Sequence, residues 1–430
     1  GGISGMKEYS IERQAPWLVG LPESWEIRKV KHFFTVVNGS TPKSSESTYW
    51  GGDITWITPA DYKTEDKYIC SSRKAITQEG LDSCGTSKVP AGSIIVSNRA
   101  PIGSIGIAEK ELCTSQGCKS LVKIAEINEE YIYYYLSVMS GPLNMLGRGT
   151  TFMELSSNDL ANFRLPIPTV KDQNAIVQIL NKKIAAINDV INKKANIIEL
   201  LQEQRTAVIC SAVTKGIDST AKMKDSGVAW LGEIPKHWGV SKSQWLFSLR
   251  KEKARPDDEQ LTASQHFGIV YQKDYMAQGS RVVQVVLGND ILKHVEPDDF
   301  VISMRSFQGG IEWSNLRGKI SSAYVMLIPQ KQYVYSPYFR WLLKSHNYIL
   351  ALQSTSNLVR DGQALRYDNF RMVDLPLVPL DEQRAIADYL NKKIAKLDNI
   401  IADVTEQIEK LKEYRQSVIS EVVTGKVAVV

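Results

Sequence analysis

A segment of about fifty residues occurs twice in this chain and constrains its fold more than any other feature. Both copies contain the phrase LNKKIA, which begins at Leu180 and again at Leu390, 210 positions later. The first copy runs from LPIPTVKDQNAIVQILNKKIA to EQRTAVICSAVTKGI, and the second runs from LPLVPLDEQRAIADYLNKKIA to EYRQSVISEVVTGKV. Each copy ends one half of the chain, so the sequence predicts an internal duplication.

Both copies carry apolar residues at alternating steps of four and three, which is the spacing of a coiled-coil seam. The predicted seam contains Leu180, Ile184, Ile187, Ile191, Ile198 and Leu201 in the first copy, and Leu390, Ile394, Leu397, Ile401, Ile408 and Leu411 in the second. Each copy begins after a proline-rich stretch, with acidic residues near the expected helix start. The pattern predicts two helices of about 40 residues, each roughly 60 Å long.

Chain order predicts how these helices run. The second globular part begins shortly after the first helix ends, and it leads directly into the second helix. If the seams pair, the helices are antiparallel, with the globular parts at opposite ends and related by a pseudo-two-fold axis. The alternative is that each helix packs on its own globular part, but a strict 3.5-residue period in both copies favours pairing.

Arg205 and Arg415 occupy equivalent positions in the two seams. Such an arginine either makes a specific contact that sets the helix register, or buries its aliphatic stem while its charge reaches solvent. Both alternatives remain open at this point.

The globular parts repeat more weakly. WLVGLPESWEI from Trp17 resembles WLGEIPKHWGV from Trp230, and GSIIVSNRAPIGSIG resembles DDFVISMRSFQGGIE in the same order. Short β-rich runs, a helical stretch and many loop residues predict an α+β fold. The predicted segments are a tag remnant with an N-terminal arm at 1–16, a globular domain at 17–164, a helical spacer at 165–217, a linker with a second globular domain at 218–374, and a second helical spacer at 375–430.

Composition excludes several classes. Hydrophobic content of 43% and charged content of 23% are typical of a globular protein, and no apolar run approaches the roughly 18 residues of a membrane span. We therefore expect a cytoplasmic protein. Five cysteines and five scattered histidines show no metal-ligand spacing, so no metal site is expected. The net charge of +5 permits DNA binding without arguing for it.

No pattern in the sequence points to catalysis. We find no Walker A motif, no glycine-rich nucleotide fingerprint, no His-Glu-x-x-His and no methyltransferase target-base motif. The carboxylates of the EEY and PDD stretches are interpreted as ordinary solvated charges. Two similar but nonidentical domains at a fixed distance suit duplex DNA, whose grooves recur about every 34 Å.

Together, the motifs GSTPKSSESTYWGGDITWITPADY, AGSIIVSNRAPIGSIGIA, TSQGCKSLV, GTTFMELSSNDLANFRLPIP and EQRAIADYLNKKIAKLDNII resemble those of the specificity subunit of type I restriction-modification enzymes. The resemblance extends from Trp17 to the C-terminus. It implies two target recognition domains, each reading one half of a bipartite asymmetric DNA sequence, and two helices that form an antiparallel coiled coil and set the gap.

The resemblance also implies a noncatalytic chain that binds no cofactor itself. Two methyltransferase subunits and the restriction subunits would be its partners, carrying S-adenosylmethionine, ATP and Mg. The alternatives are a DNA reader of a methylation-only or other phage-defence complex, a coiled-coil scaffold that does not bind DNA, and a self-sufficient methyltransferase or nuclease. The missing catalytic motifs argue against the last.

Candidate DNA contacts are polar residues on loops, because Arg pairs with guanine, and Asn or Gln with adenine. They are Asn98, Arg99, Lys119, Arg148 and Thr150 in the first domain, and Arg305, Gln308, Arg317, Arg360, Gln363 and Arg366 in the second. Arg99 and Arg305 are matched between domains that should read different sequences, which favours a structural or phosphate-contact role. The unmatched Arg148, Arg360 and Gln363 are the better candidates for specificity.

Overall fold

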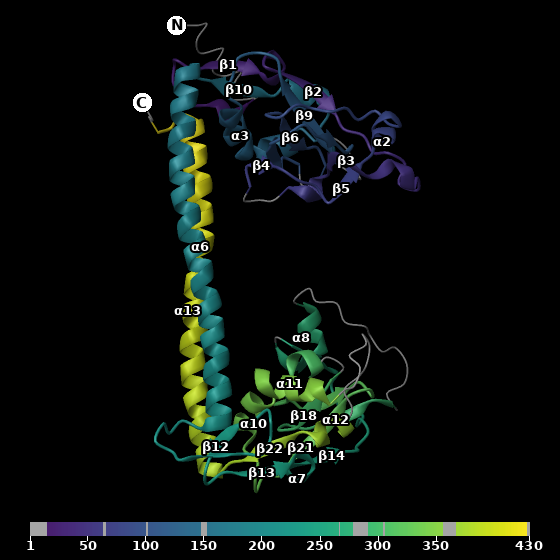
Figure 1. The fold of residues 1–430 in the computed structure, drawn as a ribbon, viewed down its shortest axis with the longest axis vertical. Helices are drawn as coiled ribbons and strands as arrows, with labels where there is room; N and C mark the ends of the chain where they lie inside the picture. The colour runs from purple at the N-terminus through teal and green to yellow at the C-terminus, as the bar shows by residue number, and fades with distance from the viewer. Residues whose placement is uncertain are drawn as a thin grey trace. The chain divides into compact units, whose positions relative to one another are not determined.

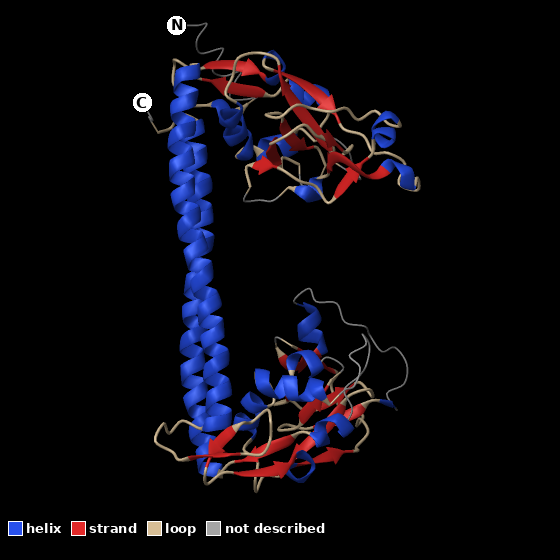
Figure 2. Cartoon of the chain, viewed as in Figure 1, coloured by secondary structure: helices blue, strands red, loops and turns tan. Residues whose placement is uncertain are grey.

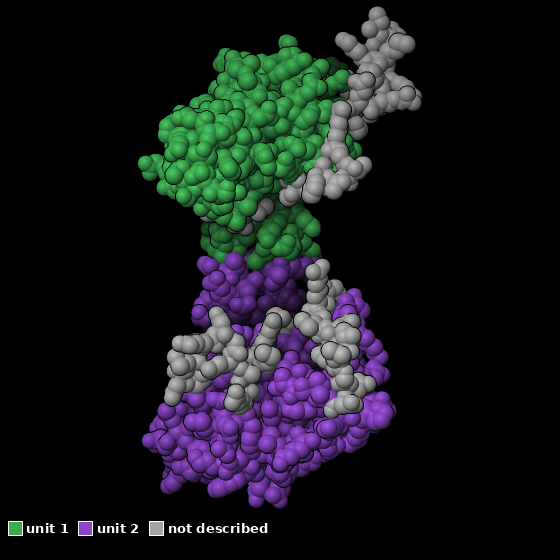
Figure 3. Space-filling view, turned by 90° about the vertical axis from the view of Figure 1, so that its right-hand side faces the viewer, with its two compact units in different colours: residues 1–193, 407–430 green, residues 194–406 purple. Residues whose placement is uncertain are grey.

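The computed structural model describes residues 15–62, 66–99, 102–147, 153–265, 267–277, 291–303, 306–355 and 367–427. The chain forms two compact units, coloured in Figure 3: residues 1–193 with 407–430 form unit 1, and residues 194–406 form unit 2. Each unit combines one globular head with half of each long helix. We call the described residues between 15 and 167 head 1, and those between 217 and 378 head 2.

Two long helices, α6 (Val170–Lys215) and α13 (Leu380–Val423), follow the heads in sequence (Figure 1). The Thr169 hydroxyl caps α6: it accepts a hydrogen bond from the backbone N–H of Asp172 and donates one to the Asp172 carboxylate. Glycines with left-handed φ, Gly216 at +75° and Gly425 at +68°, follow the C-terminal ends. Among the described residues, no helix combines the length and apolar character that crossing a bilayer requires.

The seam residues of both helices face protein. Leu180, Ile187, Ile191, Leu390, Ile394, Leu397 and Ile408 are buried, and Ile184, Ile198, Leu201, Ile401 and Leu411 are half-buried. In unit 1, the start of α6 shares a core with the end of α13, including Val418 and Val422. In unit 2, Leu201 and Val208 pack against a core that contains the start of α13.

Two cross-helix contacts define the register. In unit 1, Arg415 Nη1 donates to Asn188 Oδ1 at 2.6 Å, and in unit 2, Arg205 Nε donates to Asp398 Oδ1 at 2.8 Å. As the residue number rises from Asn188 to Arg205 along α6, the number of the partner on α13 falls from Arg415 to Asp398, so the helices are antiparallel. The two contacts are copies of each other, because their members are 210 positions apart. Both seam arginines therefore make specific contacts across the helix pair.

Each head contains a four-stranded antiparallel sheet with the same strand order, and Figure 2 shows the strands of both heads in red. Head 1 has the order β2 (Phe34–Asn38), β9 (Cys118–Lys123), β6 (Ile94–Ser97) and β7 (Ile105–Ala108), extended by the parallel strand β4 (Tyr68–Ile69). Head 2 has the order β14 (Phe247–Arg250), β21 (Val325–Pro329), β18 (Phe300–Ile302) and β19 (Glu312–Trp313). The α+β fold and the internal repeat are thus confirmed.

A second shared feature is a two-stranded antiparallel ladder that leads into each long helix. It pairs β1 (Glu26–Lys29) with β10 (Arg164–Ile167) in head 1, and β13 (Gly239–Lys242) with β22 (Asp374–Leu377) in head 2.

The remaining elements include one helix at an equivalent place in each head, α3 (Glu129–Ser137) and α10 (Ser336–Leu342), and strands that differ between the heads. Head 1 adds the sheet β5 (Lys74–Ile76), β3 (Trp50–Ile57), β8 (Cys113–Thr114), the helices α2 (Gln78–Asp82), α3 (Glu129–Ser137), α4 (Ser140–Met145) and α5 (Ser157–Ala161), and 3-10 turns at Pro16–Leu18, Val30–His32, Ser47–Tyr49 and Pro59–Asp61. Head 2 adds the pairs β11 (Met223–Asp225) with β12 (Glu233–Pro235), β15 (Leu261–Ser264) with β16 (Gly268–Tyr271), and β17 (Lys293–Val295) with β20 (Gly318–Ile320). Its helices are α7 (Ser243–Leu246), α8 (Gln272–Ala277), α9 (Ser306–Gly309), α10 (Ser336–Leu342), α11 (His346–Ser354) and α12 (Tyr367–Met372).

Candidate nucleic-acid interface

Asn98, directly after β6, is a buried structural residue. Its side chain is 1% exposed and its Nδ2 donates to Glu154 Oε1 at 2.9 Å. Its backbone carbonyl accepts from the N–H of Leu155 at 2.9 Å. The Oδ1 atom is buried and has no hydrogen-bond partner among the described residues. In this position the side chain holds the segment around Glu154 against the end of β6, and it does not reach the surface.

Arg99 is the accessible neighbour. Its side chain is 45% exposed, and Nη2 lies 3.5 Å from Glu154 Oε2, which is equally exposed. An ion pair this open contributes little to stability. The guanidinium can therefore leave Glu154 and bind a DNA phosphate at small cost. A contact of this kind fixes the position of a protein on the DNA backbone and reads no base.

Lys119, on β9, is engaged inside head 1. Its ammonium donates to Asn38 Oδ1 at 2.9 Å and to Ser157 Oγ at 3.1 Å. Burial lowers the pKa of this lysine, and the side chain is 7% exposed. These contacts join β2, β9 and α5. Lys119 therefore serves the packing of the head in the described arrangement.

In head 2, Gln308 is exposed on the short helix α9. Arg317, just before β20, is 43% exposed and is held by two acidic side chains: Nη2 lies 2.7 Å from Asp257 Oδ2, and Nε lies 3.5 Å from Asp258 Oδ1. The remaining candidates, Arg148, Thr150, Arg305, Arg360, Gln363 and Arg366, lie outside the described residues.

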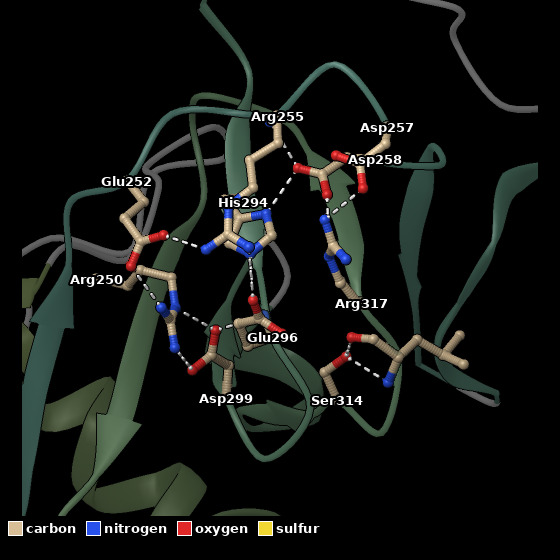
Figure 4. Close-up of polar contacts among 11 residues, drawn as sticks. Arg250, Glu252, Arg255, Asp257, Asp258, His294, Glu296, Asp299, Ser314 and Arg317 are labelled. Atoms are coloured by element: carbon tan, nitrogen blue, oxygen red, sulfur yellow. Dashed lines mark hydrogen bonds and ion pairs between the residues drawn. The ribbon is translucent and has the colours of Figure 1, made fainter.

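Arg317 belongs to an ion cluster centred on His294 (Figure 4). The imidazole is fully buried between two carboxyl groups, with Nδ1 2.6 Å from Asp258 Oδ2 and Nε2 2.7 Å from Glu296 Oε1. An ionised carboxylate only accepts hydrogen bonds. A proton on each ring nitrogen would be donated to one of the two carboxylates, so the geometry suits an imidazolium between them.

The carboxyl groups are held in the ionised form. Burial alone would raise the pKa of Asp258, but hydrogen bonds from the backbone N–H of Arg255 and from His294 outweigh it, and the pKa is lowered. The hydrogen bond from His294 is the largest influence on Glu296, and it lowers the pKa of that carboxyl. Arg255 also lies 3.2 Å from Glu296 and closes the cluster on one side.

Beside this cluster, Arg250 on β14 donates two hydrogen bonds to the carboxylate of Asp299. Nε donates to Oδ2 at 2.6 Å, and Nη2 donates to Oδ1 at 3.0 Å. Asp299 is 1% exposed. The interpretation of the EEY and PDD carboxylates as solvated charges is therefore wrong for Asp258 and Asp299, which are buried, and for Glu130, which is half-buried and paired with Lys67. Their partners lie far away in the sequence, so the local stretch carried no signal of burial.

Comparison with known proteins gives a consistent family. Residues 22–200 match the family model described as type I restriction modification DNA specificity domain. The MjaIX specificity subunit of Methanocaldococcus jannaschii is 34% identical over 186 residues, 43% of this chain and 42% of that protein. The EcoR124I/EcoR124II specificity subunit of Escherichia coli is 27% identical over 39% of this chain and 42% of its own length. These alignments span less than half of either relative.

Other similarities span nearly the whole chain. The MjaVIII specificity subunit of Methanocaldococcus jannaschii is 20% identical over 95% of this chain and 94% of that protein. One similar chain belongs to a solved structure that concerns complex assembly and conformational transition of the type I R-M system. It matches with a TM-score of 0.68 at 16% identity, and the match covers 95% of this chain and 99% of that chain. The HsdS subunit from Thermoanaerobacter tengcongensis matches with a TM-score of 0.50 at 17% identity, over 95% of this chain and 98% of its own. The structural likeness extends the shared fold over both heads and both helices, and the match of residues 22–200 assigns a type I restriction modification DNA specificity domain to the first half of the chain.

Proposed function

We propose that this chain is the noncatalytic subunit that selects the DNA sequence for a type I restriction-modification complex in the cytoplasm. Each head reads one half of a bipartite asymmetric target, and the helix pair sets the gap between the halves. The observation that carries the proposal is the duplicated architecture: two heads with one shared sheet order, each fixed to a helix pair whose register contacts are copied.

The differences between the heads support unlike half-sites. The four-stranded sheet is common and helices α3 and α10 occupy equivalent places, whereas the added strands are not shared. Accessible polar side chains lie on the divergent parts, such as Gln308 on α9, or on loops that end shared strands, such as Arg99. Loops on a fixed scaffold are where recognition residues are free to vary.

The repeat on the helices supports two copies of one partner. Equivalent surfaces recur 210 positions apart, with exposed Lys182 and Lys392 at matched positions. We infer that two methyltransferase subunits dock there and that restriction subunits join the complex. By the same inference, S-adenosylmethionine, ATP and Mg reside on those subunits, and this chain binds none of them.

The test is to express this chain with the methyltransferase subunit of its system in a methylation-free host and to map methylated adenines. The expected result is one bipartite motif with two unlike halves and a fixed gap. Replacement of one head should change one half only. Absence of any motif, with both subunits folded and associated, would refute the proposal and favour a scaffold that does not read DNA.

A further inference from the structure

The repeated phrase LNKK places two asparagines, Asn181 and Asn391, at equivalent positions of α6 and α13. Each asparagine lies eight residues after a glutamine that also recurs in both copies: Gln173 precedes Asn181, and Gln383 precedes Asn391. Eight residues of α-helix span about 12 Å and bring both positions near one face. Each long helix therefore presents two polar side chains, about 12 Å apart along its axis, toward its own head.

The glutamines make the first attachment. Gln173 is 1% exposed, and its Oε1 accepts from the backbone N–H of Asn128 at 2.9 Å, just before α3. Gln383 is 0% exposed, and its Oε1 accepts from the backbone N–H of Tyr335 at 2.8 Å, just before α10. Both amide nitrogens donate to backbone carbonyls of the segment that enters the helix, at 2.9 Å. The first turn of each long helix is thus tied to the start of a helix in the head.

In unit 1, Asn181 makes the second attachment through a charged network. Its Oδ1 accepts from Lys67 Nζ at 2.9 Å and from the hydroxyl of Tyr134, while its Nδ2 donates to Glu130 Oε2 at 2.9 Å. Burial alone would raise the pKa of Glu130, but hydrogen bonds from Lys67, Asn181 and Tyr68 lower it, so the carboxyl is ionised. The segment before β4, helix α3 and helix α6 meet at this point.

In unit 2, the second attachment uses different chemistry at the same place. Trp341 on α10 occupies the position that Tyr134 occupies on α3, and its Nε1 donates to Asn391 Oδ1 at 3.1 Å. Asn391 is exposed and Trp341 is half-buried. The asparagine is therefore the constant member of the attachment, and the head supplies a partner of its own.

We propose that Asn181 and Asn391 are positioning residues that fix the orientation of each head on its helix pair, and so hold the gap between the two DNA half-sites to one length. The proposal rests on the proposed function. Without the asparagine, each head is still held by the glutamine and by the apolar core that it shares with the long helices, and a small rotation about these contacts is the freedom that remains. A pivot of about 16° moves a point 12 Å away by about 3.4 Å, which is the rise of one base pair. The second attachment removes that freedom.

The experiment uses the complex with the methyltransferase subunit and duplexes that carry both half-sites at the native gap, or at a gap one base pair shorter or longer. The variants are Asn181→Leu and the milder Tyr134→Phe, which removes a single hydroxyl. We expect Asn181→Leu to lower the preference for the native gap about tenfold, the factor of one charge-assisted hydrogen bond, with both half-site sequences unchanged. Tyr134→Phe removes a hydrogen bond between neutral groups, so its loss should be about fivefold. Trp341→Phe should give a smaller loss, because its hydrogen bond is open to water.

Tyr135→Phe is the matched control. This tyrosine lies on the same helix as Tyr134, and its buried hydroxyl has no hydrogen-bond partner among the described residues. It should keep the full gap preference. A merely structural role predicts that Asn181→Leu and Tyr134→Phe lower methylation of all three duplexes in proportion, and that result would overturn the proposal. A wild-type complex without a bipartite motif would instead overturn the proposed function.

Discussion

The ion cluster of head 2 yields a quantitative prediction for His294→Gln. Glutamine is neutral and can donate a hydrogen bond to one carboxylate only, whereas the two ring nitrogens of the histidine lie within hydrogen-bond distance of Asp258 and Glu296 together. Asp258 is 5% exposed and keeps its contact with the backbone of Arg255. The substitution therefore leaves buried negative charge without its central cation.

Breaking a buried ion pair by removing one member costs about 3–5 kcal/mol. The Glu296 side chain is 28% exposed, so water screens part of that cost. We therefore expect unit 2 to lose about 3 kcal/mol of unfolding free energy. For a unit of this size the loss corresponds to a fall in Tm of about 6–12 °C.

The assay is thermal unfolding of the full chain, with hydrogen exchange followed separately on peptides from β17 and β20, because the two units need not unfold together. Exposed His346, at the start of α11 in the same head, supplies the control: His346→Gln should change the free energy by less than about 0.5 kcal/mol. If His294→Gln costs less than about 1 kcal/mol, the reading of this cluster as a buried imidazolium between two carboxylates is wrong.

Asp258 and Glu296 have lowered pKa values, so their contribution to stability is present above the unfolded values of about 4 and is lost as pH falls through the lower folded values. Once hydrogen exchange of β17 is corrected for the intrinsic exchange rate at each pH, its protection should be high at neutral pH and fall below pH ~4. Arg99→Ala should weaken binding of the assembled complex to all DNA sequences and reduce the log–log salt slope by about 0.9, and a changed recognition motif would contradict the phosphate-contact role. Arg415→Met keeps the apolar stem but loses the bond to Asn188, so chemical denaturation should show a loss of about 1 kcal/mol, and no loss would mean that the contact sets no register.

Periodicity explains why the helix pair could be predicted. The apolar spacing repeats often enough that a polar residue at one seam step, Lys194 between Ile191 and Ile198, does not hide it. Chain order then allows one direction of pairing. The sheet order could not be predicted, because strands such as β6 and β9 are short and pair across distant segments.

Contacts between distant residues also explain why the burial of some polar side chains could not be predicted. Asn98 and Lys119 have the polarity of DNA contacts, yet their partners Glu154, Asn38 and Ser157 turn them inward. Spacing along the chain does not report such burial. Gln173 and Asn181 carried a usable signal, since both are polar residues retained in both copies next to buried seam positions.

The copied register contacts limit how such a protein can change its length. Asn188 and Arg205 on α6 face Arg415 and Asp398 on α13, so the same number of residues separates the two contacts on each helix. An insertion between the contacts in one helix alone leaves only one of them paired. A longer coil that keeps both contacts needs equal insertions in both helices, so the two halves of the gene would have to lengthen together.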